Sequence, residues 1–404
     1  MPIRLPTERG NAAMKLFHVC LASLLALCLA AQASAFETSA RGGYVLDMTT
    51  GTVLLNKNAD TPLPPASMSK LMTLYVAFEA VHDGRLTLDE RLPVSRHAMS
   101  YDGSTMFLDT TDRVRVEDLL RGIIVLSGND ACAVIAEALS PDGTEAGFAR
   151  YMTQRAQALG MTNSVFKNSN GWPAEGHVMS MHDLVVLSRH IIEDFPEFYE
   201  MFAEREYRFD GRAPSNIYNR NPLLGLGIGA DGLKTGHTQA AGYGLVGSAV
   251  QDERRVIFAI SGLDSAAQRA RESEAIVNWA FRQFARKTVL RAGEVVARAP
   301  VWMGEAAEVG LAPGRDVETL LPVLDSERLA AEVVYTGPIR APVAKGDPLA
   351  EIVLTPEGLP EIRVPLVATE AVAPGGFTTR LRMVADRLLK RLQEGPQEAP
   401  EGAS

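Results

Sequence analysis

The spacing of apolar residues changes between residues 288 and 293, and this change separates two kinds of structure. Before it, several stretches carry apolar residues three and four positions apart, which is typical of helices that bury one face. After it, short apolar runs alternate with glycine and proline turns, which predicts strands. These runs cover residues 295–302, 308–312, 320–323, 331–335, 349–354 and 361–367. We therefore expect a small all-β domain over residues 290–372, with a spacer or interaction role because it contains no cluster of titratable residues.

The preceding part of the chain, residues 36–286, mixes strands with helices. A β-hairpin is predicted at residues 43–55, followed by a helix that runs from the region of Ser67 to about His82. Helical spacing recurs at residues 116–126, 130–139 and 145–159, strands are predicted within residues 232–250 and 254–263, and a helix is predicted at residues 266–284. This order predicts an α/β domain with a helical subdomain, and the cleft between these two parts is the natural place for a site.

Residues 14–35 have the pattern of an export signal. A lysine precedes an apolar run over residues 16–30, and residues 33–35 (Ala-Ser-Ala) have the small-x-small form of a signal-peptidase site. We expect translation to start at Met14 and cleavage to follow Ala35, so that residues 1–35 are a signal peptide and the mature protein is exported. The alternative is that the apolar run stays uncleaved as an anchor.

Residues 376–393 are expected to form an amphipathic helix. Apolar residues recur along one side of it, and the other side is basic, with a single acidic residue, Asp386, in the helix. The basic residues are Arg380, Arg382, Arg387, Lys390 and Arg391. The apolar stripe is too narrow and interrupted to span a bilayer, so the helix either lies on an anionic membrane surface or docks on the β domain. The tail, residues 394–404, is rich in proline, glycine and glutamate and is expected to be disordered.

Charge, cysteine content and histidine spacing limit the partners, disulfides and metal sites that the chain can have. The formal net charge of −9 gives no indication of a nucleic-acid partner. Once the signal is removed, Cys132 is the only cysteine left, so no intramolecular disulfide can form. His177 and His182 are five residues apart, which is poor metal-ligand spacing, and the chain has no His-Glu-x-x-His motif. We expect neither a metal nor another cofactor.

Ser67 and Lys70 are three residues apart at the expected start of a helix. Because this spacing is close to one turn, the lysine amine can reach the serine oxygen. A serine at a helix N-terminus also lies at the positive end of the helix dipole, which favours a developing negative charge on oxygen. Ser-x-x-Lys occurs by chance in many proteins, so the interpretation depends on partners further along the chain.

Two further motifs could complete a serine acyl-transfer site. In the first, Ser127-Gly128-Asn129 lies between two apolar helical stretches, where a loop can present a hydroxyl and an amide to a cleft. In the second, Lys234-Thr235-Gly236 opens a predicted strand; its threonine offers a hydroxyl to a carboxylate, and its glycine lets a substrate backbone approach the strand. Ser-x-x-Lys, a Ser-x-Asn motif and Lys-Thr-Gly in this order characterise β-lactamases and penicillin-binding proteins.

The chain resembles the serine-type D-alanyl-D-alanine carboxypeptidases, which are low-molecular-mass penicillin-binding proteins. The resemblance is closest at residues 65–73, 127–132, 159–161 and 231–243, and Ser-Gly-Asn in place of Ser-Asp-Asn favours these enzymes over class A β-lactamases. It implies a transpeptidase/β-lactamase-like α/β domain, with an antiparallel sheet, helices and a helical subdomain, over residues 36–286. It also implies the all-β domain and a membrane-associating C-terminal helix.

The resemblance also implies a role for each site residue. Ser67 attacks the carbonyl of the penultimate D-alanine, a neutral Lys70 acts as the base, and Ser127 relays a proton to the leaving D-alanine. Asn129 holds the substrate amide, Lys234 and Thr235 face the terminal carboxylate beside Gly236, and the backbone N–H groups of Ser67 and His237 form the oxyanion hole. Burial and the nearby charge of Lys234 are expected to lower the pKa of Lys70.

Two arginines are further candidates for the carboxylate. Arg271 matches by resemblance an arginine near the substrate carboxylate, and the alternative is a surface residue paired with Glu274. Arg220 is similarly placed in family members.

The resemblance implies hydrolysis of the terminal D-Ala-D-Ala bond of peptidoglycan pentapeptides on the periplasmic face of the bacterial inner membrane, with β-lactams acylating Ser67 as substrate mimics. The alternatives are D,D-endopeptidase or weak β-lactamase activity at the same site, or a non-catalytic penicillin-recognising binding protein. Fast β-lactam turnover needs a deacylating carboxylate, and residues 168–183 offer only Glu175 and Asp183, without the Glu-x-x-x-Asn pattern of class A enzymes.

Overall fold

The structure of the chain is a computed structural model that describes residues 36–212, 215–323 and 329–377. The predicted signal peptide (1–35), the predicted C-terminal helix (376–393) beyond its first two residues, and the predicted tail (394–404) lie outside the described residues. Within those described ranges, no helix is both long enough and apolar enough to cross a membrane.

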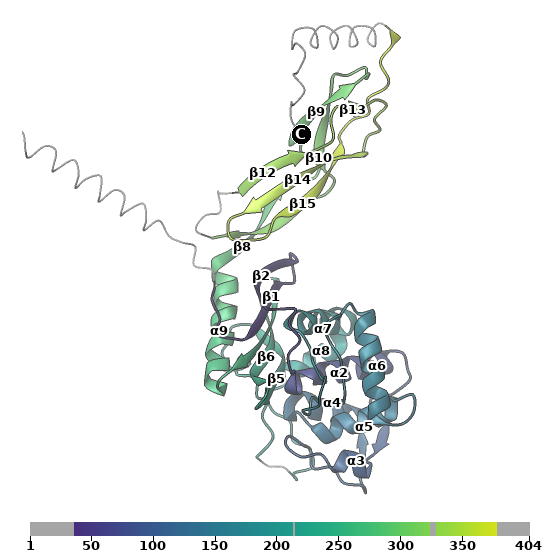
Figure 1. Ribbon diagram of the computed structural model, residues 1–404, viewed down its shortest axis with the longest axis vertical. Coiled ribbons are helices and arrows are strands. Elements are labelled where there is room, and N and C mark those ends of the chain that lie inside the picture. The colour runs from purple at the N-terminus through teal and green to yellow at the C-terminus, as the bar shows by residue number, and fades with distance from the viewer. Residues whose placement is uncertain (1–35, 213–214, 324–328, 378–404) are drawn as a thin grey trace, which may run out of the picture. The chain divides into compact units, whose positions relative to one another are not determined.

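A five-stranded antiparallel sheet organises the first part of the chain (Figure 1). Its strand order is β2-β1-β7-β6-β5. The strands are β1 (Gly42–Asp47), β2 (Thr52–Lys57), β5 (Ala230–Thr238), β6 (Gly242–Gln251) and β7 (Arg254–Leu263). The predicted N-terminal hairpin is confirmed, and its strand β1 pairs with β7, so the two ends of this part of the sequence meet in one sheet. The strand β5, which carries Lys234, lies at the edge of the sheet.

Helices cover this sheet and form the predicted helical subdomain. α7 (Met181–Asp194) contacts β1 and β7, and α9 (Ala266–Gln283) contacts β6 and β7, with Ile276, Val277 and Ala280 buried. The remaining elements are α3 (Arg96–Met99), α4 (Val116–Arg121), the π-helical turn η2 (Gly122–Leu126), α5 (Asn129–Leu139), α6 (Glu145–Ala158), α8 (Pro196–Tyr199), the 3₁₀ turn η3 (Glu200–Ala203) and the short strands β3 (Arg91–Pro93) and β4 (Arg113–Arg115). The predicted fold class is confirmed.

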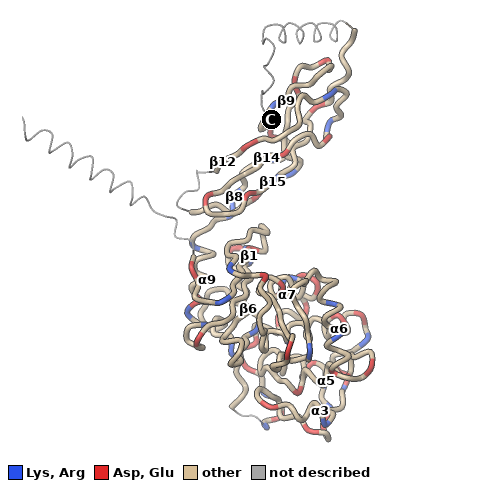
Figure 2. The backbone as a smooth tube through the Cα atoms, in the orientation of Figure 1, with Lys and Arg blue, Asp and Glu red and all other residues tan. Residues whose placement is uncertain are grey.

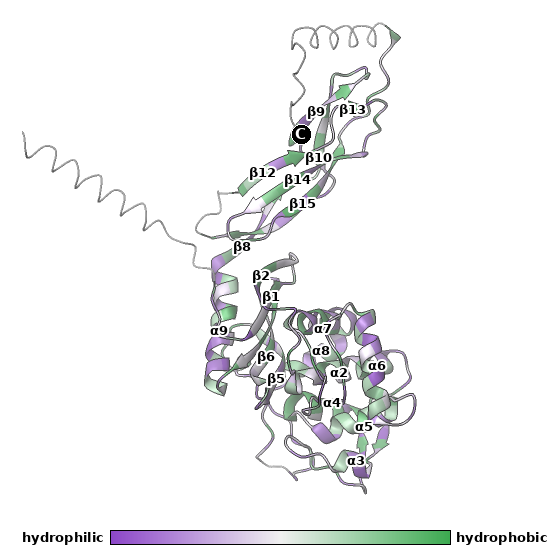
Figure 3. Ribbon diagram, in the orientation of Figure 1, coloured by the Kyte–Doolittle hydropathy of each residue, from purple (hydrophilic) through white to green (hydrophobic). Residues whose placement is uncertain are grey.

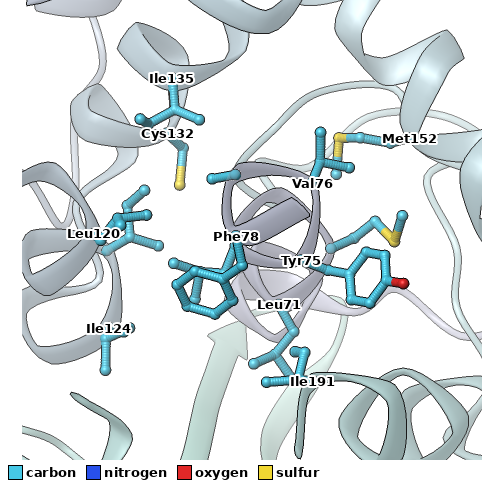
Figure 4. Packing of buried hydrophobic residues seen from close by; sticks show 14 of the residues in the cluster. Leu71, Tyr75, Val76, Phe78, Leu120, Ile124, Cys132, Ile135, Met152 and Ile191 are labelled. Atoms are coloured by element: carbon cyan, nitrogen blue, oxygen red, sulfur yellow. The ribbon is translucent and has the colours of Figure 1, made fainter. Parts of the chain in front are cut away.

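The helix α2 (Lys70–His82) runs through the middle of this subdomain and is buried on nearly all sides. In Figure 4, Leu71, Tyr75, Val76 and Phe78 leave α2 in different directions toward neighbouring helices. The side chains shown around them include Leu120, Ile124, Cys132, Ile135, Met152 and Ile191. A helix that is apolar all round is typical of a buried core element rather than an amphipathic surface helix. This packing fixes the position of Lys70, the first residue of α2.

The C-terminal part has its own hydrophobic core and consists of strands, as predicted. One sheet has the strand order β12-β14-β15-β10-β9-β13, and β8 pairs separately with β11. The strands are β8 (Phe284–Leu290), β9 (Ala297–Trp302), β10 (Glu308–Pro313), β11 (Val317–Pro322), β12 (Leu329–Val334), β13 (Ile339–Arg340), β14 (Pro348–Pro356) and β15 (Ile362–Ala368). Hydrophobic and hydrophilic residues alternate along several of these strands (Figure 3). Such alternation is expected of strands that bury one face.

Candidate active site

Ser67 lies in a 3₁₀ turn, η1 (Ala66–Ser69), and its side chain is half-buried. The predicted helix therefore begins as a tight turn, and α2 starts only at Lys70. Two glycines let neighbouring segments pack closely against this turn. A Cβ on Gly171 would collide with the carbonyl oxygen of Ala66, and a Cβ on Gly236 of β5 would press against the backbone just before Ser67. The nucleophile candidate is thus fixed between the loop at residue 171 and the edge strand.

The Lys70 amine is completely buried and contacts the Ser67 hydroxyl. Its Nζ donates to Ser67 Oγ at 2.9 Å, to Asn129 Oδ1 at 2.7 Å and to the backbone oxygen of Asn170 at 2.5 Å. Burial lowers the pKa of Lys70 to about 8, and the charge of Arg220 acts in the same direction. About a tenth of the amine is therefore neutral at pH 7 and about half at pH 8, and the neutral form is the one that can act as a base.

Lys234 and Ser127 form a second contact on the other side of the site. Ser127 follows η2 in the left-handed conformation, with a φ of 62°, and its hydroxyl accepts a hydrogen bond from Lys234 Nζ at 3.0 Å. Burial lowers the pKa of Lys234 strongly, and the charge of Lys70 lowers it further. The cation that lowers the pKa of Lys70 is Arg220, so the effect of Lys234 on Lys70 stays a prediction.

Asn129 connects the two sides of the site to the surrounding loops. Its Oδ1 accepts from Lys70, its Nδ2 donates to the backbone oxygen of Asp102 at 2.8 Å, and its backbone N–H donates to the backbone oxygen of Ser104 at 2.7 Å. Motifs separated by about sixty and one hundred residues therefore meet, as their order along the chain predicted.

The rest of the Lys-Thr-Gly strand lines the site from β5. Thr235 is buried, whereas His237 is exposed and stacks on Tyr243 of β6, with ring centroids 3.8 Å apart. These two rings face each other because His237 and Tyr243 are cross-strand partners.

The two neighbouring arginines of α9 lie in different surroundings. Arg271 is exposed on α9, where basic and acidic residues are mixed along the helix (Figure 2). Arg269, two residues earlier and about 200° around the helix, is buried instead. Its guanidinium lies 5.9 Å from the centroid of the Tyr243 ring and donates to the backbone oxygen of Arg220 at 3.4 Å. Burial lowers the pKa of Arg269, and its charge lowers the pKa of Lys234. The charge of Arg269 therefore reaches Lys234, whereas Arg271 is exposed on the same helix and its role at the carboxylate stays a prediction.

Arg220 contacts the Ser127 loop. It donates to the backbone oxygen of Leu126 at 3.1 Å and to Ser104 Oγ at 2.7 Å. Its charge lowers the pKa of both Lys70 and Lys234. The second arginine candidate thus lies within the electrostatic reach of the site.

A buried carboxylate that the sequence analysis did not identify, Glu145, lies close enough to Lys70 to affect its pKa. Glu145 Oε1 accepts from the backbone N–H of Ser169 at 2.9 Å and from its hydroxyl at 2.5 Å, while Oε2 accepts from Tyr101 at 2.7 Å and contacts His97 Nε2 at 2.6 Å. Burial alone raises the pKa of Glu145, but these hydrogen bonds hold it below its usual range. Glu145 thereby fixes the loop whose next residue, Asn170, supplies the carbonyl that Lys70 contacts.

The two carboxylates of residues 168–183 lie in different surroundings. Asp183 Oδ2 accepts from the backbone N–H of Asn163 and from Ser164 Oγ, so it has a structural role in the first turn of α7. Glu175 is exposed. Over the described parts of the chain, no three His, Cys, Asp or Glu side chains are placed to hold a metal ion.

Comparison with known proteins identifies the family. A sequence model of the Peptidase S11 family, D-alanyl-D-alanine carboxypeptidase, matches residues 29–265. The chain belongs to this family. A second model, of the C-terminal domain of penicillin-binding protein 5, matches residues 284–374. The predicted family and its serine-type carboxypeptidase activity are confirmed.

Named relatives and solved structures agree with this assignment. The chain is 35% identical to D-alanyl-D-alanine carboxypeptidase DacD from Escherichia coli, over 85% of this chain and 90% of the relative. The structure is similar to that of DacD from Francisella tularensis, with a TM-score of 0.73 and 28% identity over 85% of this chain and 96% of that one. It is also similar to penicillin-binding protein D2 from Listeria monocytogenes in its ampicillin-bound form, with a TM-score of 0.55 and 32% identity over 61% of this chain and 99% of that one.

Proposed function

We propose that this carboxypeptidase removes the terminal D-alanine from peptidoglycan pentapeptides through an acyl-enzyme on Ser67. The observation that carries the proposal is the 2.9 Å contact between Ser67 Oγ and a buried Lys70 amine whose pKa is lowered to about 8. A neutral Lys70 takes the hydroxyl proton while Ser67 Oγ bonds to the carbonyl carbon of the penultimate D-alanine. The C–N bond then breaks, Ser127 relays a proton to the departing amine, and water later hydrolyses the ester.

The backbone N–H groups of Ser67 and His237 stabilise the oxyanion in this proposal. Its support is the position of β5: the strand lies at the sheet edge, and Gly236 brings it against the turn that holds Ser67. Asn129, already fixed by two backbone contacts, orients the substrate amide. These contacts favour an extended peptide lying along β5.

The terminal carboxylate binds Lys234, Thr235 and Arg269, with Arg269 taking the role first expected of Arg271. A buried guanidinium is costly unless an anion accompanies it. In the described parts of the chain, no carboxylate pairs with Arg269, and its Nε is buried without a hydrogen-bond partner. A substrate carboxylate would supply the missing anion.

β-Lactams acylate Ser67 in the same way, because their strained amide occupies the position of the scissile bond. The relative that was solved in its ampicillin-bound form supports this step. The hydrogen-bonded position of Asp183 and the exposure of Glu175 argue against fast β-lactam turnover.

The direct test measures D-alanine release from a pentapeptide and the separation of a cross-linked dimer into monomers, with hydrolysis of a chromogenic β-lactam followed in parallel. We expect the pentapeptide to release D-alanine fastest. Faster cleavage of the dimer would favour an endopeptidase, and binding of penicillin without any release would favour a non-catalytic protein.

We also propose that the mature enzyme acts at the periplasmic face of the inner membrane, held there by residues 376–393. The basic side of this predicted helix supports binding to anionic headgroups. Deletion of residues 377–404 should leave D-alanine release intact and move the mature protein to the soluble fraction. If the signal-processed, full-length protein is already soluble and ignores anionic vesicles at low salt, the attachment is wrong.

A further inference from the structure

We propose that Glu175 makes this enzyme selective for peptides that carry a free ammonium group just before the D-Ala-D-Ala end. The ammonium would enter a cleft of about 460 Å³ next to the Ser67 turn. This inference rests on the proposed function and names the substrate class that the same site prefers.

The cleft lies where the acyl half of the substrate must leave the catalytic centre. It is lined by residues 64–66 just before Ser67, by the loop of residues 171–178, and by Thr238 and Ala240 at the end of β5. Alternate residues of a strand share a face, so Thr238 is on the same side of β5 as Gly236, the side that contacts the Ser67 turn. The cleft therefore borders the turn that holds Ser67.

The direction of the substrate along β5 follows from the two ends of the site. In the proposed reaction, the terminal carboxylate lies near Lys234 of β5, which contacts Ser127, and the bond that breaks is next to Ser67. The part of the peptide retained on Ser67 must then run the other way along the edge strand, past Gly236 toward Thr238. The side chain of the residue before D-Ala-D-Ala would reach the cleft beyond Thr238.

The charge of the cleft comes from one side chain. Glu175 is exposed, and among the described residues its carboxylate has no hydrogen-bond or ion-pair partner. The other titratable residue of the lining, His177, is buried, and burial lowers its pKa to about 4, so it is neutral at pH 7. Lys167 lies against Gly176 but does not line the cleft. The cleft thus offers a ligand a single negative charge.

An aromatic side chain adds to this preference. Trp172 lines the same cleft and is 43% exposed, and its ring is held by an edge contact with Tyr101 at 6.2 Å between centroids. Indole faces attract ammonium groups. A carboxylate and an indole in one cleft favour an alkylammonium over a neutral or anionic side chain.

The test compares two peptides that differ only by one acetyl group: Nα-acetyl-L-Lys-D-Ala-D-Ala, with a free ε-ammonium, and its Nα,Nε-diacetyl form, which is neutral. We expect the full-length wild-type enzyme at low salt to favour the ammonium peptide in kcat/KM by about two- to five-fold, the range of an exposed ion pair. In Glu175→Gln the ratio should fall to about one, and in Glu175→Lys it should drop below one. Added salt should lower the wild-type ratio.

The matched control is Glu308→Gln, which removes an exposed carboxylate from the β domain and should keep the wild-type ratio. Equal kcat/KM values for the two peptides in the wild type, or a ratio unchanged in both Glu175 variants, would overturn the inference while leaving the proposed function in place. Release of D-alanine from neither peptide would overturn the proposed function, and this inference with it.

Discussion

The two parts of the chain bury different kinds of side chain. The part before Phe284 buries acidic and basic residues: Asp47, Lys70, Asp130, Glu145, Asp183, Lys234, Arg254 and Arg269. After Phe284, Thr319 is the only polar side chain that is buried within the described ranges. The β part is therefore held together by apolar packing. Folding of the catalytic part also removes charges from water, which costs free energy.

The surroundings of the buried charges explain this difference. Asp47 pairs with Arg254, and Asp130 accepts from the backbone N–H groups of Met106 and Leu108, so these charges are compensated and structural. Lys70 and Arg269 lack a carboxylate partner among the described residues. Burial lowers the pKa of Lys70, although the charges of Asp130 and Glu145 act in the opposite direction, and it leaves Arg269 able to bind an anion. The uncompensated charges mark the functional site.

The largest effect is expected at Lys70. Lys70→Arg should slow acylation by about 10²- to 10⁴-fold, close to Lys70→Met, because a guanidinium stays protonated and cannot act as a base. In the wild type the neutral amine is the active form, so the acylation rate should rise with pH around a midpoint near 8 and fall about tenfold per unit below it. Stopped-flow measurement with a fluorescent penicillin tests both expectations. Acylation of Lys70→Arg within tenfold of the wild-type rate would place the base elsewhere.

A smaller effect separates the two neighbouring arginines of α9. Arg269→Ala should lower kcat/KM for a peptide ending in D-Ala-D-Ala by about 10- to 100-fold, since it removes a charge-assisted bond to the carboxylate. Arg271→Ala is the matched control and should change it less than about twofold. Amidation of the peptide C-terminus should harm Arg269→Ala less than the wild type. The reverse order of the two variants would restore Arg271 as the carboxylate residue.

The smallest effect on activity is expected in the β core. Leu366 is completely buried there, so Leu366→Ala should lower the free energy of unfolding by about 2–5 kcal/mol without changing D-alanine release at 25 °C. The matched substitution Leu71→Ala, in α2 beside Lys70, should lower both stability and kcat. Urea unfolding and D-alanine release measured on both variants check this contrast. A Leu366→Ala enzyme that is stable yet inactive would contradict a separate structural role for this core.

The catalytic residues could be predicted because they lie in short contiguous sequence motifs. Arg269 was not predicted because the resemblance was applied without asking which residues of the helix share its buried face. Arg269 is seven, eight and eleven residues before Ile276, Val277 and Ala280, so it shares their buried face, and this spacing could have identified it.

Other features left little trace in the sequence. β8 begins at Phe284, directly after α9, and Phe284 is the only buried residue of the strand, so no alternation of apolar residues marks it. The hydrogen bonds of Glu145 join it to His97, Tyr101 and Ser169, which are distant in the sequence. No local sequence pattern indicates such contacts.

Covalent labelling of the mature protein by a fluorescent penicillin tests the central role of Ser67 most directly. After proteolysis, mass spectrometry should find the adduct on the peptide that contains Ser67, and Ser67→Ala should show neither adduct nor D-alanine release while keeping the wild-type circular dichroism spectrum. An adduct on another residue, or labelling that survives Ser67→Ala, would contradict the account.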